Sequence, residues 1–151
     1  MQAAPPLPIV ITALIEAGLR AVLANPSPTA VRVWSRDCSW GHAAYTILVT
    51  PASHPGEPYE LVPGPTAWTA NLPQTVEIAA NGSIMVDLTG DRAGWRGTEA
   101  LKPWKHEAWQ VRIRLRIPET PEAGKFGVLI GETVSPPVIS HPPHAWLFGP
   151  S

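Results

Sequence analysis

Charged residues are scarce in this 151-residue chain. Asp, Glu, Lys and Arg make up 15% of the sequence, against about 25% in an average soluble domain. Eleven basic and twelve acidic residues give a formal net charge of −1. A cluster of excess positive charge is the usual footprint of a protein that binds nucleic acid or an anionic membrane. We therefore expect neither nucleic acid nor a membrane as a partner.

Cysteine and long hydrophobic runs are also lacking. Cys38 is the one cysteine, so no intrachain disulfide can form. This favours a reducing compartment and a cytoplasmic protein, with a secreted protein whose leader has been removed as the alternative. The most apolar stretch, Leu7–Ala24, contains Pro8, Glu16 and Arg20 and has no basic residue before it. Because it fits neither a membrane span nor a signal peptide, we interpret it as part of the fold.

Proline is abundant, with 19 residues, and 12 glycines accompany it. Proline breaks the interior of helices, so this density argues against a helical bundle and favours many short strands joined by turns. Hydrophobic residues make up 44% of the chain and include seven tryptophans. That content opposes disorder and is sufficient for the core of one domain.

The clearest predicted element is a strand from Trp109 to Ile117. Apolar and polar residues alternate over these nine positions, which is the pattern of a strand with one buried and one wet face. The apolar face carries Trp109, Val111, Ile113, Leu115 and Ile117, and the polar face carries Gln110, Arg112, Arg114 and Arg116.

Other runs of β-branched residues lie between turn signals and predict further short strands. We expect them at residues 8–16, 19–25, 31–34, 44–50, 59–62, 75–79 and 83–88, with one or two final strands over 126–131 and 133–139. Asn81-Gly82 between two of these runs fits either a tight hairpin or a corner that crosses between sheets. Residues 35–42, 52–58, 89–105 and 118–124 are expected to be loops.

The spacing of these elements predicts an all-β domain, an antiparallel immunoglobulin-like β-sandwich of about seven to nine short strands. We expect a single domain over residues 1–151, with a loose arm at 1–6 and a Pro-rich C-terminal tail at 141–151. The segment Ile11–Ala24 is the exception, because its Ala, Leu, Glu and Arg residues also favour a helix. Turn signals at Ala17-Gly18 and Asn25-Pro26 make two strands the preferred prediction.

The order of three motifs resembles that of small bacterial immunoglobulin-like domains. The motifs are Leu23–Ser27 leading into Val31–Val33, Val76–Ser83 with its Asn-Gly corner, and Trp109–Ile113. One such group is the intracellular proteinase inhibitors of bacilli, whose corner carries Pro-Gly instead. The resemblance implies a sandwich fold and offers proteinase inhibition as an alternative function. Residues 89–105 have no counterpart in it, and no inhibitory loop can be carried over.

Nucleophilic chemistry has one candidate, the pair Cys38 and His42. A Cys/His pair can generate an activated thiolate. On a strand, however, residues four apart lie about 13 Å from each other, and no third group is present to orient the histidine. We expect an inert, buried thiol instead and predict no catalytic residue.

Metal binding would need His141 and His144 together with His42, His54 or His106. Zinc requires three or four ligands in a defined geometry, and a copper site of the cupredoxin type would need Cys38 and Met85 in a different order. We therefore expect a solvated tail around His141, and neither a metal nor another cofactor. The Gly-rich segment Thr89–Gly97 lacks the Lys-Ser/Thr of a phosphate-binding loop and is interpreted as a mobile surface loop.

Binding surfaces are suggested by tryptophan and arginine. Trp40, Trp95 and Trp104 lie in predicted loops, and tryptophan is enriched at the energetic centres of interfaces. Arg112, Arg114 and Arg116 form a ladder that can grip an acidic partner, or can simply be a solvated strand face paired with nearby acids.

We expect from these features a non-enzymatic module that binds another protein through Trp-bearing loops. The alternatives are a proteinase inhibitor and a carbohydrate-binding module, in which exposed Trp side chains stack on sugar rings. Self-association into a homo-oligomer is left open.

Overall fold

The computed structural model describes residues 4–66, 68, 70–89 and 94–149. Most of the regular structure is antiparallel β-sheet, as predicted. The largest sheet has the strand order β10-β9-β4-β5-β8, and β11 pairs with β9 beyond the end of β10. Its strands are β4 (Tyr45–Pro51), β5 (Tyr59–Pro63), β8 (Trp95–Arg96), β9 (Trp109–Ile117), β10 (Gly131–Val134) and β11 (Val138–Ser140).

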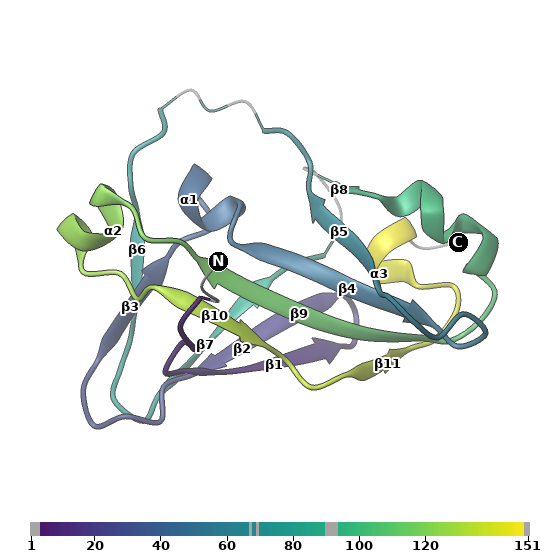
Figure 1. Ribbon diagram of the computed structural model, residues 1–151, viewed down its shortest axis with the longest axis horizontal. Helices are drawn as coiled ribbons and strands as arrows, with labels where there is room; N and C mark the ends of the chain where they lie inside the picture. Colours follow the sequence, from purple (N-terminus) through teal and green to yellow (C-terminus); the bar gives the residue numbers. More distant parts are fainter. Residues whose placement is uncertain (1–3, 67, 69, 90–93, 150–151) are drawn as a thin grey trace.

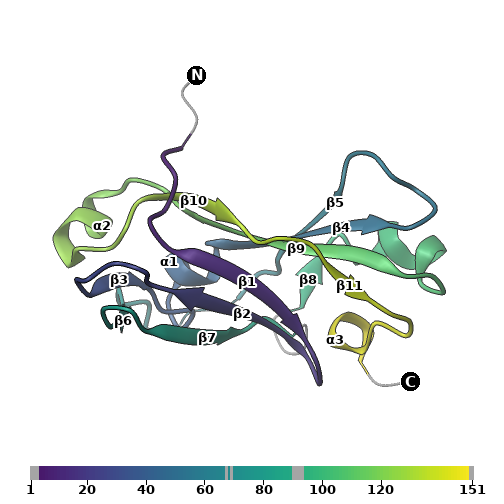
Figure 2. The same cartoon turned by 90° about the horizontal axis from the view of Figure 1, so that it is seen from below.

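A second layer of strands lies under one face of this large sheet (Figure 2). It contains a three-stranded sheet in the order β1-β2-β7 and a separate pair, β3-β6. The bounds are β1 (Val10–Ile15), β2 (Leu19–Ala24), β3 (Val31–Trp34), β6 (Thr75–Ile78) and β7 (Ser83–Asp87). Buried side chains such as Ile11 and Leu23 from this layer belong to the same apolar core as Ile113 of the large sheet. The core therefore lies between the two layers.

Strand β9 runs through the middle of the large sheet (Figure 1) and confirms the prediction for Trp109–Ile117. Its five apolar side chains are at most 1% exposed. The alternation works because each successive side chain points to the opposite face of a strand. Ile11–Ala24 also follows the preferred prediction: β1 and β2 form an antiparallel hairpin in which Ile15 lies opposite Leu19.

The Asn81-Gly82 turn is a corner between sheets. The strand before it, β6, pairs with β3, whereas the strand after it, β7, pairs with β2. Asn81 has a φ of 57°, a left-handed conformation that Asn adopts more readily than most residues. The sequence was compatible with either a tight hairpin or a corner between sheets. The turn is a corner because β6 and β7 pair with different strands.

Asn25 joins this corner to the turn that follows β2. The residue is 1% exposed. Its Nδ2 lies 2.8 Å from the carbonyl oxygen of Thr29, 3.1 Å from that of Ile78 and 3.2 Å from that of Ala79. Its Oδ1 accepts a hydrogen bond from the backbone N–H of Ser27 at 3.0 Å. The Asn25 side chain thus forms hydrogen bonds with backbone groups in the turn after β2 and near the Asn81-Gly82 corner, which are far apart in sequence.

Four short helical segments correct the predicted loops. They are α1 (Ser39–His42), the 3-10 helix η1 (Thr98–Trp104), α2 (Pro121–Phe126) and α3 (Ala145–Phe148). Helix α2 replaces the loop expected at 118–124: Pro121 starts it, and the Thr120 hydroxyl accepts the N–H of Ala123 at 3.1 Å. A Ser/Thr cap followed by proline is a helix start, so this signal was present in the sequence.

The strand predicted for residues 126–131 is wrong. Phe126 ends α2, Gly127 follows with a φ of 67°, and β10 begins only at Gly131. In this run Val128 is instead buried in the core, and its N–H donates to the Ala123 carbonyl of α2 at 2.9 Å. The loop predicted for Thr89–Lys105 also contains regular structure, namely β8 and η1. Residues 90–93 of the Gly-rich segment lie outside the described residues.

The described residues of both terminal segments make more contacts with the fold than predicted. In the expected N-terminal arm, the Pro5 carbonyl accepts the N–H of Glu132 at 2.8 Å, which tethers the arm to β10. In the C-terminal segment, Trp146 and Leu147 are 3% and 8% exposed. The prediction of a solvated tail from residue 141 onward is therefore wrong, because Trp146 and Leu147 pack into the core. Within the part of the chain that the structure describes, no helix is long and apolar enough to cross a membrane.

Replacing Asn25 by alanine tests the link between the two turns. Asn25→Ala leaves the buried Ile78 carbonyl and the part-buried carbonyls of Thr29 and Ala79 without this donor. We expect it to lower the free energy of unfolding by about 1–3 kcal/mol. Urea denaturation followed by Trp fluorescence measures the loss. Asn71→Ala is the matched control, because Asn71 bonds Ser39 at an exposed site. A loss of less than about 1 kcal/mol in Asn25→Ala, no larger than the loss in Asn71→Ala, would contradict the role given to Asn25.

Candidate functional site

Trp95 is an anchor of the fold and not an exposed contact residue. It lies in β8 and is 8% exposed. Its indole N–H donates to the Leu88 carbonyl at 3.1 Å, and the Arg36 guanidinium lies 5.7 Å from the centre of its ring. This burial corrects the prediction that Trp95 presents a binding surface.

Trp104 and Trp40 are half-buried and also serve packing. Trp104, the last residue of η1, donates its indole N–H to the Tyr59 hydroxyl at 3.2 Å and stacks on His54 with ring centres 4.9 Å apart. Trp40, in α1, stacks on Trp34 at 5.5 Å. It borders a cleft of about 340 Å³ together with Trp34 and Pro118. The structure does not bring Trp40, Trp95 and Trp104 into one exposed surface.

The thiol of Cys38 is buried, as predicted. Cys38 and His42 lie on one helical turn, since the His42 N–H donates to the Cys38 carbonyl at 2.9 Å. The segment is therefore a helical turn and not a strand, yet the two side chains have separate partners. The thiol donates to the Ser35 carbonyl at 3.2 Å, and His42 Nε2 lies 3.0 Å from the Gly64 carbonyl oxygen. Among the described residues, no three His, Cys, Asp or Glu side chains are placed to hold a metal ion.

A buried polar network surrounds His144 at the C-terminal end of the chain. His144 is 1% exposed and lies flat on Trp109, with ring centres 3.5 Å apart and an angle of 4° between the planes. Its Nε2 lies 2.7 Å from the Glu107 carbonyl oxygen. A carbonyl can only accept, so Nε2 carries the proton and donates.

The remaining polar atoms of this network have partners as well. With Nε2 protonated, neutral His144 accepts at Nδ1, and the Ser140 hydroxyl donates to it at 2.6 Å. Ser140 in turn accepts the indole N–H of Trp146 at 2.8 Å. In the sequence, His144 was a candidate metal ligand. In the structure, it fastens the last turn of the chain to β9.

The arginine ladder of β9 lies on the outer face of the large sheet. Arg114 bonds Glu60 at 2.8 Å and lies 3.7 Å from a Glu132 oxygen. Arg112 and Arg116 are exposed, and their strand neighbours on this face are Leu48 and Glu132. The ladder therefore divides into one arginine paired with acids of β5 and β10 and two that point to solvent.

Aliphatic side chains accompany the arginines on this outer face. Val62, Val134 and Ile139 are 41%, 37% and 51% exposed. Leu48 also points outward from β4, yet it is only 6% exposed between Arg112 and Glu60, which are its partners across the strands. Long charged side chains can cover apolar surface with their methylene stems in this way.

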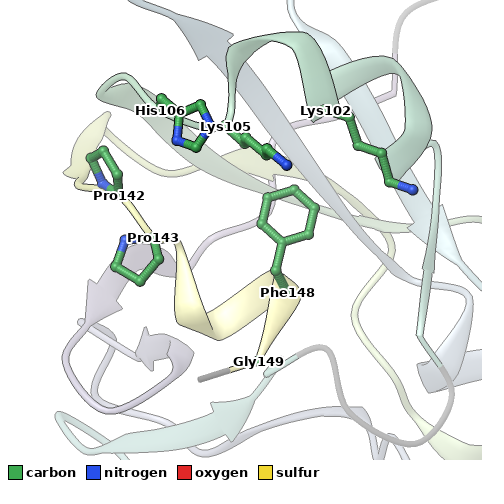
Figure 3. Close-up of a pocket in the computed structure, with 7 residues that line it drawn as sticks. All are labelled: Lys102, Lys105, His106, Pro142, Pro143, Phe148 and Gly149. Carbon is green, nitrogen blue, oxygen red and sulfur yellow. The ribbon is translucent and has the colours of Figure 1, made fainter. Parts of the chain in front are cut away.

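A cleft of about 460 Å³ separates the end of η1 from α3. Lys102, Lys105 and His106 border it on one side, and Pro142, Pro143, Phe148 and Gly149 border it on the other (Figure 3). This basic cluster was not among the predicted sites. Three basic residues within five positions, in a chain with so little charge, were the available signal.

Comparison with protein-family models, with curated proteins and with solved structures gives no match for this chain. The class that the structure itself defines is a mostly antiparallel β protein with a few short helices.

His144 should make the stability of the protein depend on pH. Burial lowers the pKa of His144 below its ordinary value of 6.5. The unfolded chain then binds a proton more readily than the folded one, so stability that is present above about pH 6.5 is lost as the pH falls below it. Urea denaturation at about pH 7.5 and about pH 5.5 measures this loss.

His144→Asn is the test variant, because Asn tolerates the left-handed backbone at this position, where φ is 55°. It should be less stable than the native chain at the higher pH and should lose less stability on acidification. His106→Gln, at an exposed histidine that does not contribute to this pKa shift, should keep the native pH dependence. An unchanged pH dependence in His144→Asn would contradict the assignment.

Proposed function

We propose that this chain is a non-enzymatic protein-binding module of the immunoglobulin-like β-sandwich type. We further propose that it recognises its partner through the outer face of the large sheet. We call this surface the arginine face and define it by the charged and exposed aliphatic residues on it. They are Arg96, Arg112, Arg114, Arg116, Glu60, Glu132, Val62, Val134 and Ile139.

The sandwich interpretation is supported by the two layers and by the corner between them. The layer of β1, β2 and β7 shares its core with the large sheet (Figure 2). The Asn81-Gly82 corner carries the chain from the pairing of β6 with β3 to that of β7 with β2. Sheets that stack face to face and exchange strands through such corners are characteristic of sandwich folds.

The composition of the arginine face carries the proposal. Exposed Arg112 and Arg116 share this face with aliphatic side chains that are more than a third exposed. Protein interfaces are enriched in arginine and combine apolar contacts with a polar surround. Among the described residues, no helix or strand packs over this face (Figure 2). Trp40, Trp95 and Trp104 are weaker candidates for contact with a partner, because most of their surface packs against other residues of the fold.

Charge indicates what kind of partner this face would select. Four arginines share it with two glutamates, whereas the whole chain has a net charge of −1. Arg114 is already balanced by Glu60 and Glu132. The excess positive charge therefore comes from the other arginines and favours an acidic protein surface, by electrostatic complementarity across the interface.

The chemistry of the buried groups supports a module without catalysis. Ser140 and His144 form a hydroxyl–imidazole pair within the core, and both residues are 1% exposed. A nucleophile must reach its substrate. This pair stabilises the fold, because its hydrogen bonds are directed at the chain itself.

Site-specific photo-cross-linking in cells that naturally express the chain tests the proposed face. Benzoylphenylalanine at position 134 or 139 should cross-link to another polypeptide. The same probe at position 10 or 85 is the control, because Val10 and Met85 are 54% and 59% exposed and lie on the β1-β2-β7 sheet. We expect the control positions to give less cross-linked product by about tenfold.

Reversal of charge completes the test. Arg112→Glu with Arg116→Glu should remove the cross-links formed at position 134. The free energy of unfolding should fall by about 1 kcal/mol, because a carboxylate at position 116 lies opposite Glu132. Equal cross-linking from both faces, or none from positions 134 and 139, would overturn the proposal. A second copy of this chain as the cross-linked partner would identify the module as self-associating.

A further inference from the structure

The cleft between η1 and α3 has the size and the mixed lining of a small-ligand site. Its volume of about 460 Å³ falls within the range of about 300–1,000 Å³ that is typical for such sites. Figure 3 shows basic side chains on one side and Pro142, Pro143 and the Phe148 ring on the other. The cleft shares no residue with the arginine face, so ligand binding in it is independent of the proposed function.

The walls of this cleft are held in place by the buried core. Phe148 packs edge-to-face on Trp109, with ring centres 5.9 Å apart and 72° between the planes. Trp109 also donates its indole N–H to the Trp104 carbonyl at 3.0 Å, which fixes the end of η1. Both walls therefore rest on one buried side chain. A cleft that is formed before binding avoids the entropic cost of ordering its walls.

The charges around the cleft leave one lysine without an acid. Lys102 is paired with Glu99 at 2.9 Å. Glu107, next to His106, is turned to Ser53, whose hydroxyl donates to it at 2.7 and 2.8 Å. In the described part of the chain, Lys105 has no ion pair. About one uncompensated positive charge thus faces the cleft. It can neutralise a singly charged anion, whereas a doubly charged anion would enter with one charge desolvated and unpaired.

We propose that this cleft binds a monocarboxylate with an aromatic or alkyl body. The carboxylate lies at Lys105, with the ring of His106 as a further hydrogen-bond donor. The apolar body lies between Phe148 and the Pro142-Pro143 wall, where its burial supplies the favourable free energy of transfer from water. Either a free small acid or the C-terminal residue of a polypeptide presents this chemistry.

N-acetyl-L-phenylalanine is the probe, and its primary amide is the matched control without the charge. Titration followed by amide NMR signals of the 15N-labelled protein should give saturable shifts with a Kd of about 1 mM or tighter for the acid. We expect binding about tenfold weaker for the amide, for acetate and for phenyl phosphate. The largest shifts should come from residues 102–106 and from Phe148 and Gly149.

Lys105→Ala should weaken binding of the acid by about tenfold without changing the melting temperature, because Lys105 is exposed. Lys125→Ala, at an exposed lysine of α2, should bind as the native chain does, and so should the Arg112→Glu/Arg116→Glu variant. Equal binding of acid and amide, tighter binding of phenyl phosphate, or no shift at about 10 mM acid would overturn the proposal.

A second titration distinguishes the two sources of the carboxylate. Acetyl-Gly-Gly-Phe with a free C-terminus carries the same terminal group on a longer backbone. Binding about tenfold tighter than that of N-acetyl-L-phenylalanine would identify a polypeptide C-terminus as the ligand, whereas equal affinities would identify a free small acid. Each result supports the carboxylate site itself.

Discussion

The burial of Trp109 is the constraint on which most of this structure depends. Its side chain is 0% exposed and lies at the start of the central strand, where it contacts His144, Trp146 and Phe148. Its indole N–H also holds the last carbonyl of η1. Removing a buried Trp side chain generally costs about 3–5 kcal/mol. One residue thus joins the large sheet, the 3-10 helix and the C-terminal helix.

The two candidate surfaces result from the geometry of β9. Because its apolar side chains are committed to the core between the layers, the alternating arginines must point away from it. Neighbouring strands then add Glu60, Glu132 and exposed aliphatic residues to the same face. At its first residue, the strand also supports both walls of the basic cleft. The proposed partner surface and the proposed ligand cleft therefore depend on the same strand without sharing residues.

The candidate sites were only partly predictable. The arginine ladder was visible in the sequence because a strand repeats every two residues. Arg114 pairs with Glu60 while Arg112 and Arg116 stay exposed. This depends on the order and register of β10, β4 and β5 around β9. For the Trp residues, the sequence predicted too much exposure. A loop position suggests an exposed side chain, but Trp95 is buried and donates to the Leu88 carbonyl, which lies near it only in the folded chain.

The sequence by itself determined the all-β character, the strand Trp109–Ile117 and the β1-β2 hairpin, since alternation and turn residues are local signals. Only the tertiary structure decided that Asn81-Gly82 is a corner, that residues 145–148 form a helix with Trp146 and Leu147 buried, and that Lys105 and Phe148 border one cleft. These outcomes depend on contacts between residues far apart in the chain, such as Glu107 with His144. Composition and periodicity carry no information about which distant segments will meet.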